Sequence, residues 1–259
     1  MESASGMFSS ADAYQRHVGR YGDALSRAHI EAAGVRRGDW VLDVGCGPGA
    51  LTCALADVTG AEHVAAVDPS PSFVEACRAR VVGADVRVAS AEKLPEFGRR
   101  FDAVMSQLVV NFMQDAEAGI DAMRAAARDR ALITSCVWDY ADGMTMLRAF
   151  WDAALEIDPT APDEGRTMRY CTPAELRALW ETCGLEDAET SAIEVQATYA
   201  DFEDLWAPFP TGLGPSGAYC ASLDAGAREA LHDGFFRRLG EPSGAFTLRA
   251  RAWLVRGRA

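Results

Sequence analysis

The sequence predicts an α/β protein built on a doubly wound, mostly parallel β-sheet. Short apolar runs alternate with segments of helical character through the first half of the chain, which is the pattern of βαβ units. The first run leads directly into a cluster of glycines, as at a strand-to-helix turn. Several runs are almost continuously apolar, which indicates strands that are buried on both faces of the sheet.

Five strands and three helices are expected in this half. The strands are Trp40–Val44, His63–Val67, Val86–Val88, Phe101–Met105 and Ala131–Val137. The helices are Ala50–Asp57, Ser72–Arg80 and Asp115–Arg128. Ligands of open α/β sheets bind at the carboxyl ends of such strands, so the site is expected where these runs end.

The second half has a different pattern. Thr172 and Pro173 suit the start of a helix that runs to Cys183, and Gly184 suits its exit. Apolar and polar residues then alternate around Ile193–Ala197 and again over 246–255, which predicts two strands near one edge of the sheet.

No clear linker divides the chain, so a single domain over residues 1–259 is predicted. Three segments lie outside the strand–helix alternation and are expected to form helical insertions above the carboxyl ends of the strands. The predicted parts are a helical lid (1–34), a ligand-binding core (35–137) and two pocket insertions (138–171 and 200–242).

Composition excludes several classes of protein. The 259 residues carry 25 Lys and Arg against 38 Asp and Glu, a formal net charge of −13, which argues against nucleic acid and anionic membranes as partners. The seven cysteines include no pair at zinc-site spacing, so no metal is predicted. The sequence shows no signal peptide and no membrane-length apolar run, so a cytoplasmic protein is expected.

The glycine turn carries the strongest chemical signal. Residues 41–49 read V-L-D-V-G-C-G-P-G, with G-x-G-x-G spacing in place of the dinucleotide G-x-G-x-x-G, and they lack the Gly-Lys-Ser/Thr of a P-loop. Asp43 lies inside the strand, where a pyrophosphate would be repelled. Asp68 ends the second strand, where a carboxylate accepts hydrogen bonds from ribose hydroxyls. Two carboxylates beside a glycine turn predict a cationic nucleoside as the ligand.

These motifs resemble class I S-adenosylmethionine (SAM)-dependent methyltransferases, of the small-molecule type found in ubiquinone and menaquinone biosynthesis. The resemblance includes V-D-P-S at 67–70, A-E-K-L-P at 91–95, F-D-A-V at 101–104 and Y-C-T-P at 170–173, with a lid element at Tyr14 and 19–21. It implies a Rossmann-like sheet of seven strands with an antiparallel last strand, and SAM as the cofactor. A homodimer is left open.

The resemblance also assigns roles to residues. The expected cofactor-binding set is Arg20, Tyr21, Asp43, Gly45, Cys46, Gly47, Asp68, Pro69, Ser70, Ser90, Ala91, Glu92 and Gln107. Two positions depart from the family pattern. Ser90 replaces the usual acidic residue before the Ala-Glu pair, and Arg128-Asp129-Arg130 replaces a Pro-Gly-Gly turn.

The sequence indicates less about the methyl acceptor and its binding site than about the cofactor site. A general base is not identified, and the candidates are His17, Tyr14, Tyr140 and His232. Candidate substrate-binding residues are Trp138, Tyr140, Met144, Trp151 and Trp206, although an aromatic and Met stripe also suits a plain core.

The predicted function is methyl transfer from SAM to a small organic acceptor by in-line displacement. A non-catalytic SAM-binding or assembly protein is the alternative. A tRNA or protein methyltransferase is disfavoured by the net charge and by the absence of an Asn-Pro-Pro-Tyr-like tetrapeptide after the fourth strand. A nicotinamide-dependent oxidoreductase is disfavoured by the glycine spacing and by Asp43.

Overall fold

The computed structural model describes residues 18–259, so Tyr14 and His17 lie outside the described residues. The chain divides into two compact units. Unit 1 contains the described residues up to Tyr21 together with Trp138–Met168 and Glu194–Arg251, and unit 2 contains Gly22–Val137, Arg169–Ile193 and Ala252–Ala259. The expectation of a single domain stays a prediction.

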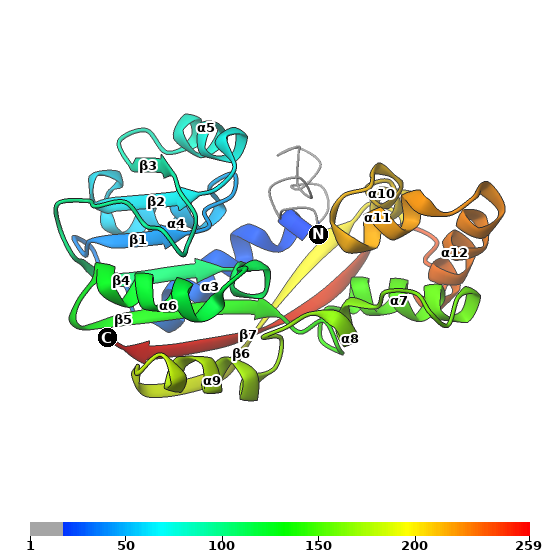
Figure 1. Ribbon diagram of the computed structural model, residues 1–259. Helices are drawn as coiled ribbons and strands as arrows, with labels where there is room; N and C mark the ends of the chain where they lie inside the picture. The colour runs from blue at the N-terminus through cyan, green and yellow to red at the C-terminus, as the bar shows by residue number, and fades with distance from the viewer. Residues whose placement is uncertain (1–17) are drawn as a thin grey trace. The chain divides into compact units, whose positions relative to one another are not determined.

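The seven-stranded sheet has the order β3-β2-β1-β4-β5-β7-β6, which confirms the predicted Rossmann-like fold (Figure 1). Its strands are β1 (Val41–Val44), β2 (Val64–Asp68), β3 (Asp85–Val88), β4 (Phe101–Gln107), β5 (Ala127–Trp138), β6 (Glu186–Tyr199) and β7 (Phe246–Arg258). The first five pair in parallel and the final strands are antiparallel. Strands β6 and β7 each contribute residues to both units.

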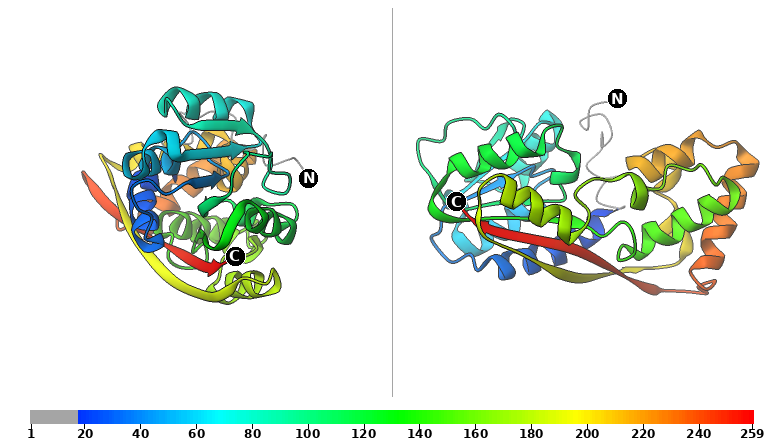
Figure 2. Two further views of the ribbon diagram at one scale, coloured as in Figure 1. Left: turned by 90° about the vertical axis from the view of Figure 1, so that its left-hand side faces the viewer. Right: turned by 60° about the horizontal axis from the view of Figure 1, so that its bottom comes forward.

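Helices cover both faces of the sheet in unit 2 (Figure 2). Helix α3 (Gly22–Ala33) packs against α4 (Ala50–Thr59), and α6 (Ala116–Ala126) packs against α9 (Pro173–Thr182). Helix α5 (Pro71–Arg80) packs on β2 and β3. The side chains of Ser70, Asp115 and Thr172 cap α5, α6 and α9, as their residue types predict.

One predicted boundary is wrong. The helix expected over Asp115–Arg128 ends at Ala126, and residues 127–130 begin strand β5. The register between β4 and β5 shifts after Phe101, and Arg130 has a φ of 60°, so the chain forms a bulge there. This bulge stands where the family has Pro-Gly-Gly, which explains how the turn forms without those residues.

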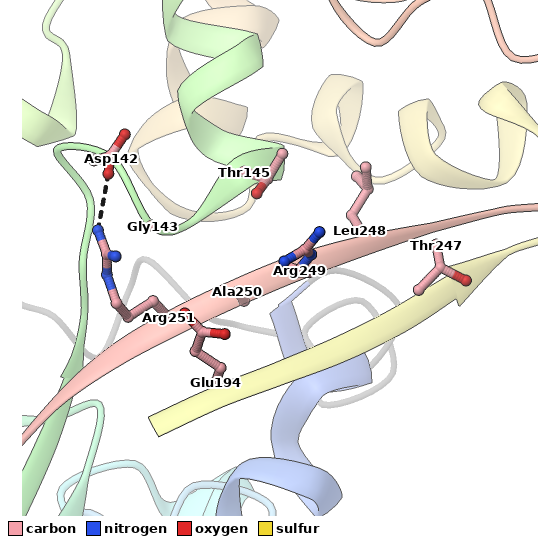
Figure 3. Close-up of a pocket in the computed structure, with 9 residues that line it drawn as sticks. All are labelled: Asp142, Gly143, Thr145, Glu194, Thr247, Leu248, Arg249, Ala250 and Arg251. Atoms are coloured by element: carbon pink, nitrogen blue, oxygen red, sulfur yellow. Dashed lines mark hydrogen bonds and ion pairs between the residues drawn. The ribbon is translucent and has the colours of Figure 1, made fainter. Parts of the chain in front are cut away.

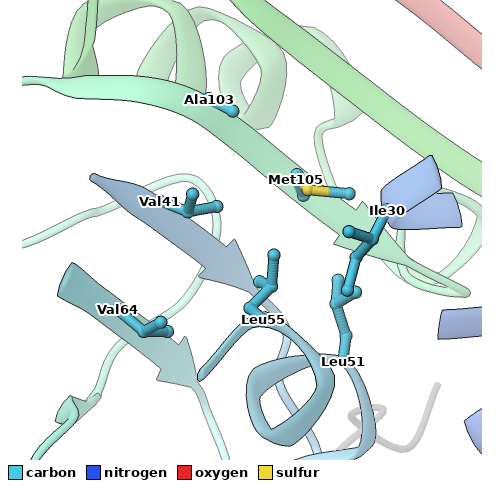
Figure 4. Close-up of a cluster of buried hydrophobic side chains, with 7 residues drawn as sticks. All are labelled: Ile30, Val41, Leu51, Leu55, Val64, Ala103 and Met105. Carbon is cyan, nitrogen blue, oxygen red and sulfur yellow. The ribbon is translucent and has the colours of Figure 1, made fainter. Parts of the chain in front are cut away.

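A hydrophobic cluster joins β1, β2 and β4 to helices α3 and α4 (Figure 4). Its buried members are Ile30, Val41, Leu51, Leu55, Val64, Ala103 and Met105. The spacing of Leu51 and Leu55 places both on one face of α4, which explains why that helix packs on the sheet below the glycine turn.

His29 lies fully buried on α3, within unit 2. Its Nε2 lies 3.2 Å from the hydroxyl oxygen of Thr134, and its Nδ1 lies 3.5 Å from Cys136 Sγ. Burial lowers the pKa of His29 from 6.5 to about 4, because the charged ring would lose its hydration. His29 is therefore a neutral core histidine at neutral pH.

The protein is therefore expected to lose stability as the pH falls below 6.5. Between pH 6.5 and about 4 the His29 ring is mostly protonated in the unfolded chain and mostly neutral in the folded chain. The free energy of unfolding therefore falls by up to about 1.4 kcal/mol for each pH unit in this range. Urea unfolding at pH 7.5 and 4.5 should show a smaller drop in the free energy of unfolding for His29→Gln than for the natural protein. His63→Gln, at a partly exposed site, is the control. Equal drops in both variants would contradict the assignment.

Unit 1 is held together by aromatic side chains. Its helices are α7 (Thr145–Ile157), α8 (Glu164–Thr167), α10 (Phe202–Trp206), α11 (Gly214–Ser222) and α12 (Ala225–Arg238), with 3-10 turns at Val18–Tyr21 and Phe209–Thr211. The Phe150 and Phe209 rings stack at 4.5 Å, and Phe235 meets both edge-on. Residues 206–217, which are rich in glycine and proline, are mostly helical, because their aromatic side chains pack into this core.

Between residues 18 and 259, no helix combines the length and apolar character that crossing a membrane requires.

Candidate cofactor site

The glycine turn joins the buried strand β1 to helix α4. The amides of Gly45 and Cys46 both donate to the Val67 carbonyl of β2, at 2.8 and 2.9 Å. Gly45 has a φ of 80°, and a Cβ there would lie 2.4 Å from a Val109 methyl carbon. A Cβ on Gly47 (φ 51°) would meet nothing within 4 Å. The turn is therefore packed tightly at Gly45 and open at Gly47, where a ligand can approach the backbone.

Asp68 ties the end of β2 to this turn. Its Oδ2 accepts a 2.9 Å hydrogen bond from the Gly47 amide, and its Oδ1 accepts a 2.8 Å hydrogen bond from the Ser70 amide. Burial raises the pKa of the Asp68 carboxyl, and the two amides oppose that shift. The carboxylate is thereby held in one orientation with lone pairs still available to a ligand.

Asp43 lies fully buried on β1. The Thr52 hydroxyl of α4 donates to its Oδ2 at 2.6 Å, while its Oδ1 is buried without a hydrogen-bond partner among the described residues. Burial raises the pKa of Asp43 to about 8. A buried carboxyl oxygen with no donor is costly, so this atom suits a ligand that brings a donor or a positive charge.

The remaining predicted positions of unit 2 follow β3 and β4. Ala91 is buried, and the Glu92 side chain accepts from the Gln114 amide at 3.2 Å. Ser90 is half-buried and Pro69 is exposed. Gln107 ends β4, where its Nε2 donates to the Ser26 hydroxyl at 2.9 Å and its Oε1 is buried without a partner among the described residues.

Comparison with known proteins identifies the family. A model described as a methyltransferase domain matches residues 41–130. An uncharacterized protein of Mycobacterium tuberculosis is 34% identical over 113 residues, 42% of this chain, and the match spans only 40% of that relative. A ubiquinone biosynthesis O-methyltransferase of Azorhizobium caulinodans is 30% identical over 189 residues, 70% of this chain and 69% of the relative. The chain belongs to the class I SAM-dependent methyltransferases.

The fold comparison agrees with this. Phosphoethanolamine N-methyltransferase 2 of Haemonchus contortus, solved with SAM bound, superposes with a TM-score of 0.55 at 15% identity, over 91% of this chain and 52% of that one. At that identity the match concerns the fold alone. SAM is the cofactor of this methyltransferase, as its motifs predicted. The open backbone at Gly47 and the Asp43 Oδ1, which has no hydrogen-bond partner between residues 18 and 259, fit a ligand with a ribose and an ammonium group.

The methyltransferase's predicted lid residues lie in unit 1. The Arg20 guanidinium pairs with Asp204 and lies 4.9 Å from the centre of the Tyr199 ring. Tyr21 is fully buried, and its hydroxyl accepts from the Tyr199 hydroxyl at 3.2 Å. Both side chains therefore have partners within unit 1, and their contact with cofactor stays a prediction.

All five predicted substrate-binding side chains lie in unit 1 and are buried: Trp138, Tyr140, Met144, Trp151 and Trp206. The Trp151 indole donates to Glu164 at 2.9 Å, whereas the Trp138 indole nitrogen is buried without a partner among the described residues. Trp206 and His232 meet edge-on at 5.1 Å, and His232 Nε2 lies 2.9 Å from Glu203. Carboxylates on both sides of the His232 ring raise its pKa against the effect of burial.

Unit 1 also carries an open groove of about 340 Å³ along β7, shown in Figure 3. It is lined by Asp142, Gly143, Thr145, Glu194, Thr247, Leu248, Arg249, Ala250 and Arg251. Arg251 is bound to Asp139 and Asp142. None of the predicted substrate residues lines this groove.

Sequence reasoning missed three residues that support the turn. Thr52 orients Asp43, Val109 packs on Gly45, and Cys77 of α5 packs on Gly49. Thr52 was detectable, because it lies beside Leu51 on the buried face of α4. Val109 and Cys77 come from distant parts of the chain, and no local pattern indicates their contacts.

Proposed function

We propose that the protein transfers a methyl group from SAM to an oxygen, nitrogen or carbon nucleophile of a small organic acceptor. The observation that carries this proposal is the pairing of a backbone open at Gly47 with two buried carboxyls, Asp43 and Asp68. When bound, SAM supplies a methyl group on a sulfonium, a good leaving group. The protein's main task is then to align acceptor and methyl, since alignment alone can supply much of the rate.

Each residue around the turn has a proposed task. Asp68 accepts hydrogen bonds from the ribose hydroxyls, with Pro69 and Ser70 beside the adenine. Asp43 holds the ammonium directly or through water, and the backbone of Gly45, Cys46 and Gly47 contacts the aminoacyl part. The Gln107 carbonyl contributes to the same ammonium, and Ser90, Ala91 and Glu92 face the adenine. The lid residues Arg20 and Tyr21 complete the set.

The acceptor is proposed to be a small molecule. The net charge of −13 disfavours nucleic acid. The relative that aligns with 70% of this chain at 30% identity is an O-methyltransferase of ubiquinone biosynthesis, which favours a hydroxyl on an aromatic, quinone-like molecule. Tyr140 and His232 are the described candidates for the base that such a hydroxyl needs.

Two measurements test this function. Calorimetry with S-adenosylhomocysteine, the demethylated product, should show micromolar binding. Mass spectrometry of a phenol and quinol panel incubated with protein and SAM should then show products heavier by about 14 mass units, the difference between CH₃ and H. Absence of binding would overturn the cofactor assignment.

A non-catalytic SAM-binding protein is the second candidate. Ser90 favours it, since a hydroxyl at this position accepts the adenine amino group without charge assistance. Binding of S-adenosylhomocysteine with no labelled methyl transferred to any molecule of a cell extract would support this second candidate against the first.

SAM affinity is expected to rise with pH between 6 and 7. Below its pKa of about 8 the Asp43 carboxyl is mostly protonated in the free protein, and the cofactor ammonium favours the carboxylate, so binding releases a proton. Affinity should gain up to about tenfold per pH unit. Calorimetry at pH 6.0, 6.5 and 7.0 measures this slope.

Asp43→Asn is the matched variant for that experiment. It should bind SAM more weakly and with little pH dependence, because the amide does not titrate. A slope that persists in Asp43→Asn would place the titrating group elsewhere.

A further inference from the structure

Asp43 and Gln107 lie near the carboxyl ends of neighbouring strands and on one face of the sheet. Asp43 of β1 pairs in register with Met105 of β4, and Gln107 is two residues further along β4. Met105 packs with Ile30 of α3 and Leu51 of α4, on the face that these helices cover (Figure 4). Side chains two residues apart in a strand share a face, so Gln107 also faces α3 and α4.

One buried hydroxyl from each helix holds one of these side chains. Thr52 of α4 donates to the Asp43 carboxyl, as described above. Ser26 of α3, which is fully buried, accepts a 2.9 Å hydrogen bond from the Gln107 Nε2. The Gln107 amide also lies beside the His29 ring of α3, whose pKa it raises against the larger effect of burial. Loss of the Ser26 hydroxyl would therefore free the nitrogen end of the Gln107 side chain.

The chain turns sharply directly after Gln107. Leu108 has a φ of 62°, in the left-handed region that residues with a Cβ rarely adopt. Val109 follows it and packs against Gly45 of the glycine turn. A backbone in such a conformation persists only where the surrounding contacts hold it. The hydrogen bond from Gln107 to Ser26 is one of these contacts, because it ties the residue before the turn to α3.

The direction of the Gln107 carbonyl follows from its peptide bond. The Leu108 amide donates to the Cys136 carbonyl of β5 at 2.8 Å. In a trans peptide the carbonyl points opposite to the amide hydrogen, so the Gln107 carbonyl points away from β5 and toward β1, on the other side of β4. The Gly45 amide, which follows β1 at the same level, donates to the Val67 carbonyl of β2 instead. The Gln107 carbonyl therefore faces the glycine turn.

We propose that Ser26 is a positioning residue for the cofactor. Through the Gln107 side chain it fixes the Gln107 carbonyl in the direction that accepts a hydrogen bond from the cofactor ammonium. An ammonium group donates to more than one oxygen, so this carbonyl and the Asp43 carboxyl serve it together. The proposal rests on the function proposed above, and it assigns a task to a serine that belongs to no cofactor motif.

The effect of Ser26 is confined to one end of the cofactor. The ribose is assigned to Asp68, whose carboxylate is oriented by the amides of Gly47 and Ser70 and not by α3. Ser26 reaches the site only through Gln107, which is assigned to the ammonium. A change at Ser26 should therefore weaken ligands that carry the amino acid part and spare ligands that consist of the adenosine part alone.

Calorimetry with two ligands tests this selectivity on the full chain. S-adenosylhomocysteine carries the ammonium, whereas 5′-methylthioadenosine has the adenosine and the sulfur but no amino acid part. Ser26→Ala should weaken binding of S-adenosylhomocysteine by about three- to tenfold, the effect of one hydrogen bond, and leave binding of 5′-methylthioadenosine unchanged. Ser216→Ala, which removes another buried helical serine, on α11, is the control and should change neither affinity.

A double-mutant cycle tests the route through Gln107. Gln107→Met keeps the length of the side chain without its amide, so it should show the same selective loss, also where Ser26→Ala folds poorly. Adding Ser26→Ala to Gln107→Met should weaken binding no further, because the contact is already absent. Equal weakening of both ligands, unchanged binding of both, or additive losses in the double variant would overturn the proposal. Failure of the natural protein to bind S-adenosylhomocysteine would instead count against the proposed function.

Discussion

Replacing Asp68 by alanine is expected to abolish measurable cofactor binding, with affinity for S-adenosylhomocysteine falling by at least about 100-fold. The carboxylate is proposed to accept two ribose hydroxyls, and each hydrogen bond to a charged acceptor contributes about 1.5–3 kcal/mol. The same carboxylate holds the Gly47 and Ser70 amides, so its loss also releases the turn.

A conservative variant at the same position and a control at an exposed carboxylate complete this experiment. Asp68→Asn keeps one carbonyl acceptor and similar size, so it should bind more weakly than the natural protein but more tightly than Asp68→Ala. Asp85→Ala removes an exposed carboxylate on β3 that pairs with Arg87, and it should leave affinity unchanged. If Asp68→Ala binds within threefold of the natural protein, Asp68 is not the ribose ligand.

Alanine substitutions at Gly45 and Gly47, two glycines of one turn, are expected to reduce stability to very different extents. Gly45→Ala should destabilise the protein by about 2–4 kcal/mol, since its φ of 80° disfavours a side chain and its Cβ would overlap Val109. Gly47→Ala should cost only about 1 kcal/mol, because its Cβ meets no protein atom within 4 Å.

Cofactor affinity should depend on the same two positions in a different way. The methyl group of Gly47→Ala occupies the space proposed for the cofactor, so affinity should fall at least about tenfold in a protein that still folds. Urea unfolding and calorimetry on both variants measure the two effects. A Gly47→Ala protein that binds normally would show that the cofactor does not approach this amide.

Much of the site could be predicted because its signals are local. The V-L-D-V-G-C-G-P-G stretch and Asp68 each depend on a strand and the turn that follows it, and parallel pairing of β1 with β2 brings them together automatically. The Ser70, Asp115 and Thr172 caps are equally local. The bulge at Arg130 was not predicted, because it depends on how β5 pairs with β4 and not on the residues of β5 alone.

Contacts between distant segments required the structure. The burial of His29 depends on Thr134 and Cys136, more than 100 positions away, and nothing in the sequence of α3 indicates it. The residues around Trp206 have glycine and proline spacing typical of loops. They fold as short helices because Phe150 and Phe235 provide an apolar surface for them.

The α/β fold, the cofactor and the two acidic positions beside the glycine turn could be predicted from sequence, because each depends on short-range periodicity or on a motif whose residues follow one another. The environment of those positions depends on the folded structure. It leaves the Asp43 Oδ1 without a hydrogen-bond partner among the described residues, presses Gly45 against Val109, and packs Cys77 on Gly49. Burial and contact are properties of segments that meet only when the chain folds, and they raise the pKa values of the Asp43 and Asp68 carboxyls.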